Sequence, residues 1–139
     1  MPPIQANEQM PGFDIKIAPD TLTERVIGAA VEVHRHLGPG LLETAYAAAL
    51  EHELVARDIG FASEVLIPIQ YKGATLDGVL RMDLLVEGEL VVELKAADAI
   101  HPVHYAQVLT YLRVGGFSRG LLINFNVMKL VDGVRRFVL

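Results

Sequence analysis

Residues 83–95 hold three side chains whose types and spacing suit chemistry on a phosphate group. Asp83 lies on one expected strand, and Glu93 and Lys95 lie at the end of the next. Side chains at positions i and i+2 share one face of a strand, so Glu93 and Lys95 must point the same way. The pattern therefore predicts a carboxylate beside an ammonium group on one face of a sheet.

Whether Asp83 joins that face depends on the turn between the two strands. A two-residue turn at 87–88 would place Asp83 opposite Val92, on the wrong face. A three-residue loop at 87–89 places it opposite Glu93 instead, as one bulge also would. We expect the three-residue loop, which brings two carboxylates and one ammonium group together.

Such a trio suits the hydrolysis of a phosphodiester. Hard divalent cations prefer carboxylate oxygens such as those of Asp83 and Glu93, and a bound cation neutralises charge that develops on the phosphate. Lys95 could orient or deprotonate the attacking water, or balance charge on the phosphate. The alternative is a cross-strand salt bridge between exposed residues, which contributes little to stability.

Four other residues are candidates for the same site, and each has a structural alternative. Glu43 and Tyr46 are three apart and share a helix face. Glu43 could equally be a first-turn carboxylate favoured by the helix dipole, with Tyr46 in the core. Gln107 and Tyr111 are four apart on a later helix, either near a substrate or as a buried tyrosine with a glutamine partner. His36 and His104 are further candidates to approach the site.

The composition suits one globular domain without thiol chemistry. The chain has 139 residues, of which 52% are hydrophobic and 21% charged, enough to build a core. It has no cysteine, which excludes disulfides, thiolate metal sites and cysteine nucleophiles and favours a cytoplasmic protein. No apolar run approaches the ~18–20 residues of a membrane span. The net charge of −5 argues against avid, charge-driven DNA binding, although metal-binding carboxylates add to that charge.

The hydrophobic pattern predicts an α/β (α+β) fold of order ααβββαββ, with a mixed central β-sheet flanked by helices. Residues 1–20, with three prolines, are expected to form an arm, and residues 21–139 the domain. Thr21 and Glu24 suggest a capping box, Gly60 a helix end, and Pro68 an edge or bulged strand. The expected helices are 21–37, 41–57 and 102–115. The expected strands are 65–71, 79–86, 90–94 and 120–125, followed by a last hairpin partner at 127–139 that turns at 132–133.

Several segments together resemble the PD-(D/E)XK nuclease superfamily. The core motif is Asp83 followed by the Glu-x-Lys of residues 93–95, although Met82 stands where the motif has a proline. Residues 40–46 look like the signature of the GxxExxY family of bacterial proteins within that superfamily. The similarity runs from about residue 22 to the C-terminus. Residues 91–96, Gln107 with Tyr111, and residues 120–125 also fit that family.

The resemblance implies a restriction-endonuclease-like core and a nuclease dependent on Mg²⁺ or Mn²⁺. It implies Asp83 and Glu93 as metal ligands and Lys95 as the catalytic lysine. Glu43 fits the acidic residue that an early helix brings to the metal in many members. Gln107, Tyr111 and Tyr46 are expected to bind the substrate.

Three functional hypotheses follow. The leading one is a metal-dependent phosphodiesterase acting on nucleic acid. The second is a non-catalytic binding or assembly protein that retains the fold and forms a homo-oligomer or binds a partner protein; the net charge of −5 and the proline-rich arm favour it. The third is an enzyme acting on a small phosphate compound or nucleotide, which ranks last because no nucleotide-cradling glycine-rich loop is present. No membrane partner is expected.

Overall fold

A computed structural model describes residues 20–139 of the protein. It contains two helices, three strands, a third helix and two strands, in the predicted order, with a short 3-10 helix before the last strand. The predicted arm falls almost wholly on residues 1–19, which lie outside the described residues. The elements are α2 (Thr21–Leu37), α3 (Glu43–Ala56), β1 (Phe61–Tyr71), β2 (Ala74–Val86), β3 (Leu90–Lys95), α4 (Pro102–Gly115), β4 (Arg119–Asn124), η1 (Leu130–Gly133) and β5 (Val134–Val138).

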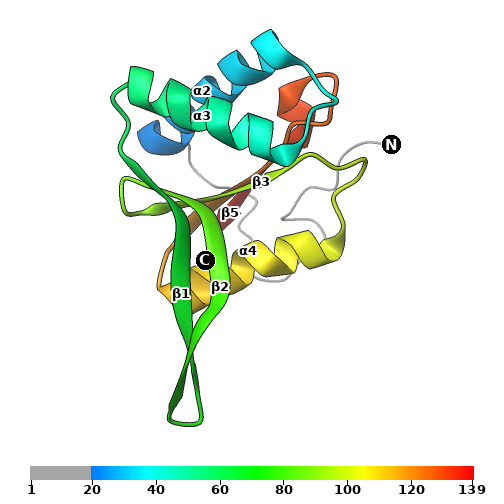
Figure 1. Cartoon of the computed structure of the whole chain (residues 1–139). Coiled ribbons are helices and arrows are strands. Elements are labelled where there is room, and N and C mark those ends of the chain that lie inside the picture. The colour runs from blue at the N-terminus through cyan, green and yellow to red at the C-terminus, as the bar shows by residue number, and fades with distance from the viewer. Residues whose placement is uncertain (1–19) are drawn as a thin grey trace.

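The five strands form one sheet, and their order in it follows their order in the chain. β3 and β4 pair in parallel and are connected by α4, whereas the other three pairs are antiparallel. In Figure 1, α2 and α3 lie together over one side of the sheet and α4 lies on the other. This mixed sheet flanked by helices confirms the predicted fold class. No helix within residues 20–139 is both long enough and apolar enough to cross a membrane.

The core has two layers, and β3 supplies both because the side chains of a strand alternate between faces. The even-numbered residues of β3, from Leu90 to Leu94, join the core under α2 and α3. Val91 joins the second core, which packs under α4. Glu93 and Lys95 follow Val91 in this alternation, so they face the α4 layer.

The predicted cap of the first helix is wrong by one residue. Asp20, not Thr21, caps α2, and its Oδ1 accepts a hydrogen bond from the backbone N–H of Thr23 at 2.8 Å. The Oδ2 of Asp20 also pairs with Arg119 at 3.0 Å, at the start of β4. Asp20 therefore belongs to the domain rather than to the arm.

The end of α3 also differs from the prediction. Asp58 adopts a left-handed conformation with φ of 56°, and the backbone N–H of Ile59 bonds to the carbonyl of Leu54 at 2.9 Å. Aspartate tolerates this conformation better than most residues because its short polar side chain bonds locally. Gly60 therefore does not cap the helix.

β1 and β2 form a long hairpin, which projects well beyond the helices in Figure 1. Lys72 and Gly73, with φ of 49° and 82°, make the predicted turn at its tip. The pairing shifts register across Pro68, which confirms the predicted bulge on an edge strand. Three large apolar side chains on the hairpin remain exposed: Leu66 (60%), Tyr71 (56%) and Leu76 (41%).

The last strand is shorter than predicted. Only Val134–Val138 pairs with β4, and η1 occupies the stretch before it. η1 buries Leu130 in the core under α2 and α3, which draws this stretch out of the sheet. Gly133 then passes so close to β4 that an added Cβ would lie 2.1 Å from the carbonyl oxygen of Asn124.

Candidate functional site

The candidate site lies where β2 and β3 stop pairing. Leu84 is the residue of β2 farthest from the connecting loop that still pairs with β3, and it lies opposite Val92. The three-residue loop at 87–89 sets this register, so Asp83 and Glu93 occupy the next pair of opposing positions. The predicted register is therefore confirmed.

The carboxylate of Asp83 acts as a hydrogen-bond acceptor for β3 just beyond the point where the backbones of β2 and β3 stop pairing. Its Oδ2 accepts a hydrogen bond from the backbone N–H of Leu94 at 2.8 Å. This bond satisfies an amide of β3 and fixes the carboxylate of Asp83 beside Glu93. The side chain of Asp83 remains half-buried, so part of it is open to solvent.

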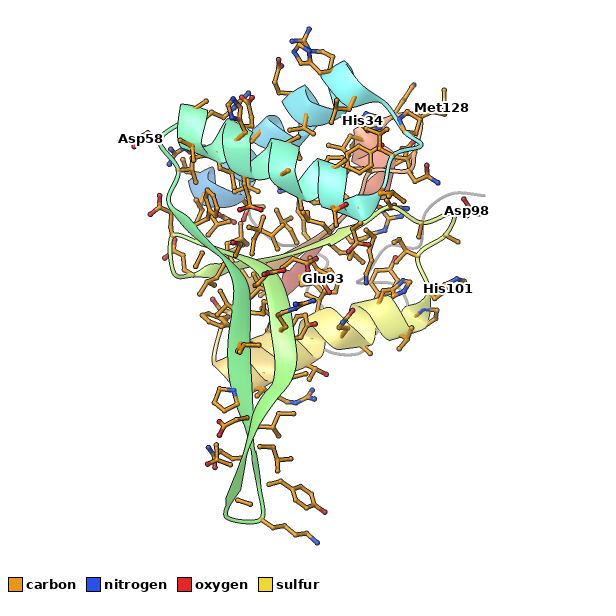
Figure 2. All side chains as sticks on the ribbon, in the orientation of Figure 1. His34, Asp58, Glu93, Asp98, His101 and Met128 are labelled. Atoms are coloured by element: carbon orange, nitrogen blue, oxygen red, sulfur yellow. The ribbon has the colours of Figure 1, made fainter. Side chains whose placement is uncertain are left out.

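Glu93 is the most perturbed acid among the described residues. It is 3% exposed and lies between α3 and α4 in Figure 2. Burial, together with a hydrogen bond to Asp83 and the negative charge of Asp83, raises the pKa of Glu93 to about 9, and Lys95 opposes the rise. Glu93 is therefore protonated at neutral pH and donates to Asp83. Its Oε1 is buried without any hydrogen-bond partner.

Lys95 lies within electrostatic reach of groups from both helical layers. On α4, burial lowers the pKa of His104, and the positive charge of Lys95 lowers it further. On α3, burial raises the pKa of Glu43; Lys95 opposes that rise and Asp83 adds to it. Asp83 and Lys95 are thus electrostatically linked to Glu43 of α3 and to Glu93 of β3, and Lys95 is also linked to His104 of α4.

Gln107 and Tyr111 lie on the α4 side of the same centre. The amide Nε2 of Gln107 donates to the hydroxyl of Tyr111 at 2.8 Å. Tyr111 is 3% exposed, and burial followed by the negative charge of Glu93 raises the pKa of its phenol to about 12. The phenol thus keeps its proton, and the bond from Gln107 leaves that proton available for donation.

Tyr46 is a core residue, contrary to the expectation that it contacts substrate. Its side chain is fully buried, and its ring stacks on Phe125 with centroids 4.5 Å apart. Its hydroxyl donates to the carbonyl of Gly38 and accepts from the backbone N–H of Leu41 at 3.2 Å. The role of Tyr46 is to hold the loop that precedes α3.

His36 does not approach the site either. It pairs with Glu32 at 2.8 Å on α2, and the side chain of His36 is 67% exposed. The pair lies one helical turn apart on that helix, which explains why His36 turns toward Glu32. Of the two histidines that the sequence suggested, only His104 is electrostatically linked to the site.

A cavity of about 380 Å³ opens between α3 and the β1–β2 hairpin. It contains two predicted site residues, Glu43 and Asp83. It also contains residues that the sequence analysis missed, above all Arg81, which precedes Asp83 by two positions on β2. The remaining lining residues are Thr44, Ala47, Glu51, Ser63, Glu64, Leu84 and Leu94.

Two asparagines missed in the sequence fix the loops around the site. The side chain of Asn124, opposite Lys95 in the parallel pair, accepts from the backbone N–H of Ala97 at 3.0 Å and donates to its carbonyl at 2.9 Å. Asn126 accepts from the backbone N–H of Gly40 at 3.1 Å and donates to Asp98 at 3.2 Å. These bonds connect the loop before α3 to the loop after β3.

The donor chemistry of the site fits a hard divalent cation only in part. Asp83 and Glu93 offer adjacent carboxylates, and the buried Oε1 of Glu93 has no partner. Within residues 20–139, however, no three His, Asp or Glu side chains converge in a way that could hold a metal. The expected set of three protein carboxylates is therefore not assembled, because Glu43 lies at the first turn of α3 with an exposed side chain.

The chain belongs to the PD-(D/E)XK nuclease superfamily. A sequence model of that superfamily matches residues 20–137, nearly all of the described chain. The superfamily indicates a nuclease-like function, and its members generally use divalent metals.

One solved structure, the crystal structure of SSO0001, is similar to this chain, with a TM-score of 0.50 and 17% sequence identity. The match covers 86% of this chain and 78% of that one, and it supports the fold alone. No curated protein matches the chain.

Proposed function

We propose that the protein is a divalent-metal-dependent nuclease that hydrolyses phosphodiester bonds of nucleic acid. The observation that carries the proposal is the unpartnered Oε1 of Glu93, buried beside the carboxylate of Asp83. A buried polar atom without a partner costs free energy, and such atoms call for a functional explanation. A cation that takes oxygen ligands, Mg²⁺ or Mn²⁺, supplies one.

Asp83 and Glu93 would hold the cation in this proposal. When bound, the cation supplies positive charge that stabilises the phosphate as negative charge develops on it. Glu93 must release its proton for this purpose. Glu43 is not proposed as a protein ligand; its carboxylate, at the mouth of the cavity, tunes the charge beside Asp83 and Lys95.

Lys95 positions the attacking water in this proposal. It shares a strand face with Glu93 and lies opposite Asn124, whose side chain fixes the loop that follows. The oxygen of water forms a bond to phosphorus as the bond to the leaving oxygen breaks. Lys95 orients that water and balances the phosphate charge. The attacking water gives up one proton to solvent and the leaving oxygen takes one up, so protons balance.

Gln107 and Tyr111 complete the α4 side of the site. Because the phenol of Tyr111 stays protonated, it can donate a hydrogen bond to a phosphate oxygen. Gln107 holds the phenol oxygen from the other side. Tyr46 acts indirectly, by holding the loop before Glu43.

We also propose that the chain belongs to the GxxExxY family, because its signature residues have distinct physical roles. Gly40 has φ of 102°, which is strained for other residues. Glu43 opens α3 at the cavity, and Tyr46 binds the backbone on both sides of Gly40. The cysteine-free composition favours a cytoplasmic setting for this activity.

The test is cleavage of single- and double-stranded DNA and RNA with Mg²⁺ or Mn²⁺. Asp83→Ala and Lys95→Ala should each abolish cleavage while the circular dichroism spectrum stays unchanged. Asp77→Ala on the same strand and Lys72→Ala at the hairpin tip are matched controls, because both side chains are exposed and neither lines the cavity. Cleavage that survives both site substitutions contradicts the proposal.

A second candidate function is a non-catalytic assembly protein that retains the fold. The exposed apolar side chains of the projecting hairpin favour it, because such residues on an arm are available for contact with another chain. Light scattering on the unaltered protein and on Leu66→Ser/Tyr71→Ser tests it. Self-association that disappears in the variant, together with no cleavage under any metal, would favour assembly over catalysis.

A further inference from the structure

The cavity beside Asp83 has an uneven charge distribution. Four acidic side chains line it, whereas Arg81 is the single basic residue among its described lining residues. An arginine in such a position is available to bind one anionic group. The acidic residues that line the cavity are Glu43, Glu51, Glu64 and Asp83.

β2 positions Arg81 for such a role. Arg81 and Asp83 are two residues apart on that strand, and both side chains line the cavity. Arg81 also lies close enough to α4 to affect Tyr111. Burial and Glu93 raise the pKa of Tyr111, and the positive charge of Arg81 opposes part of that rise. Arg81 therefore lies between the cavity and the catalytic side of the site.

Arg81 forms only a weak ion pair, with Glu64 of β1. Its Nη1 lies 3.7 Å from Oε1 of Glu64, and the two side chains are 63% and 73% exposed. Ion pairs of this kind contribute little to stability. A phosphate group accepts two parallel hydrogen bonds from a guanidinium group and binds it more strongly, so it can replace Glu64.

We propose that this cavity admits one strand of nucleic acid and that Arg81 binds the phosphate of that strand next to the reacting one. The inference rests on the proposal that nucleic acid is the substrate. A cavity of about 380 Å³ is suited to a compact group. Duplex DNA would bring a second row of phosphates to a cavity that has no second basic side chain among its described lining residues, and its acidic side chains would repel those phosphates. The substrate class is therefore a single-stranded end or segment.

Fluorescence anisotropy with a labelled single strand of about 12 nucleotides, and with the duplex of the same sequence, tests the proposal. The measurements use Ca²⁺ as the cation, which takes oxygen ligands, and compare several salt concentrations. The single strand should bind at least about tenfold more tightly than the duplex. Arg81→Ala should weaken single-strand binding about ten- to a hundredfold and reduce the salt slope by about 0.7, the loss of one phosphate contact.

Two further variants separate this role from a general charge effect. Arg35→Ala on α2 removes the same charge from a side chain that is 69% exposed and does not line the cavity, so it should change affinity less than twofold. Glu64→Gln should tighten binding about two- to fivefold, because it removes both a competitor for Arg81 and a repulsive charge. Equal effects of Arg81→Ala and Arg35→Ala would overturn the inference, as would equal affinity for the duplex.

The binding assay does not depend on cleavage, so the two proposals can fail separately. If Arg81→Ala binds normally while Asp83→Ala abolishes cleavage, this inference is wrong and the nuclease proposal stands. If Arg81 governs single-strand binding and no metal supports cleavage, the inference stands and the hydrolytic function is wrong. If the unaltered protein binds neither oligonucleotide, both are wrong.

Discussion

The carboxylate of Asp83 holds the backbone N–H of Leu94 at the point where β2 and β3 cease to pair. The same residue thus closes the end of a sheet ladder and supplies a carboxylate to the site. Different substitutions of Asp83 can remove these two roles separately. Asparagine keeps an oxygen that can accept the bond from Leu94, whereas alanine does not.

We therefore expect Asp83→Asn to abolish cleavage with a loss of stability below about 1 kcal/mol, and Asp83→Ala to cost about 1–3 kcal/mol in addition to activity. Urea unfolding of both variants at pH 7, without metal, measures the difference. Equal stability of the two variants would show that the bond to Leu94 contributes nothing.

Glu93→Gln should stabilise the metal-free protein at alkaline pH. The pKa of Glu93 rises from 4.5 in the unfolded chain to about 9 in the folded protein. Its favourable contribution is fully present below pH 4.5 and is lost as pH rises through about 9. Glutamine resembles the protonated acid at every pH, so the variant should gain about 1–3 kcal/mol near pH 9 relative to the unaltered protein, with little difference near pH 4.5. Thermal unfolding from pH 4.5 to 9 measures it, and a pH-independent difference would contradict the shifted pKa.

Metal binding should release a proton. Because Glu93 holds a proton at neutral pH, a cation that takes its carboxylate must displace that proton. Titration calorimetry with Mn²⁺ at pH 7, in two buffers of different ionisation enthalpy, should report close to one proton released for each ion, and the apparent affinity should rise with pH up to about 9. Asp83→Ala should bind no metal. Binding without proton release would mean that Glu93 is not a ligand.

Asn124→Ala should impair both stability and activity. Its side chain makes both hydrogen bonds to the backbone of Ala97 and is only 3% exposed. Its Oδ1 also accepts from the backbone N–H of Asn126 at 3.2 Å, so its loss leaves three backbone groups without this partner and should cost about 2–4 kcal/mol. Cleavage should fall at temperatures where the variant remains folded, because the strand end that carries Lys95 loses its support. Asn126→Ala, on a less buried side chain, is the matched control and should cost about 1 kcal/mol or less.

Asp20→Ala should weaken the start of α2 by about 1 kcal/mol. Burial alone would raise the pKa of Asp20, but hydrogen bonds from Thr23 and the charge of Arg119 outweigh it and lower the pKa. The contribution of Asp20 is therefore present above pH 3.8 and is lost as pH falls further. Asp20→Asn retains the capping oxygen and should lose less. Acid titrations of stability for the three proteins would contradict this if the variants matched the unaltered protein at pH 7.

The register of the site was predictable because a three-residue loop, unlike a two-residue turn, brings Asp83 to the face of Glu93 and Lys95. The cap of α2 was not. Asp20 and Thr21 both make good helix caps, and the ion pair with Arg119, 99 positions away, favours Asp20. No local pattern contains that contact.

The prediction from sequence failed in different ways for Arg81, which it omitted, and for Tyr46, which it placed at the substrate. A spacing of two along a strand placed Glu93 beside Lys95, but the same rule does not place Arg81, because Met82 and Leu84 of β2 join opposite cores. Tyr46 was expected at the substrate because it belongs to a signature. Its hydroxyl reaches Gly38 and Leu41 instead, and the sequence does not reveal the path of that loop.

The agreement between strand order and chain order has a consequence for folding. Each strand pairs only with the strands that precede and follow it in the chain, so the sheet can grow by successive additions as residues leave the ribosome. Short loop closures cost little entropy, and only the parallel addition of β4 must wait for α4. We therefore expect Asp83 and Glu93 to meet when the β2–β3 hairpin closes, before α4 covers them, so that the acidic pair is first formed in contact with water and is buried later.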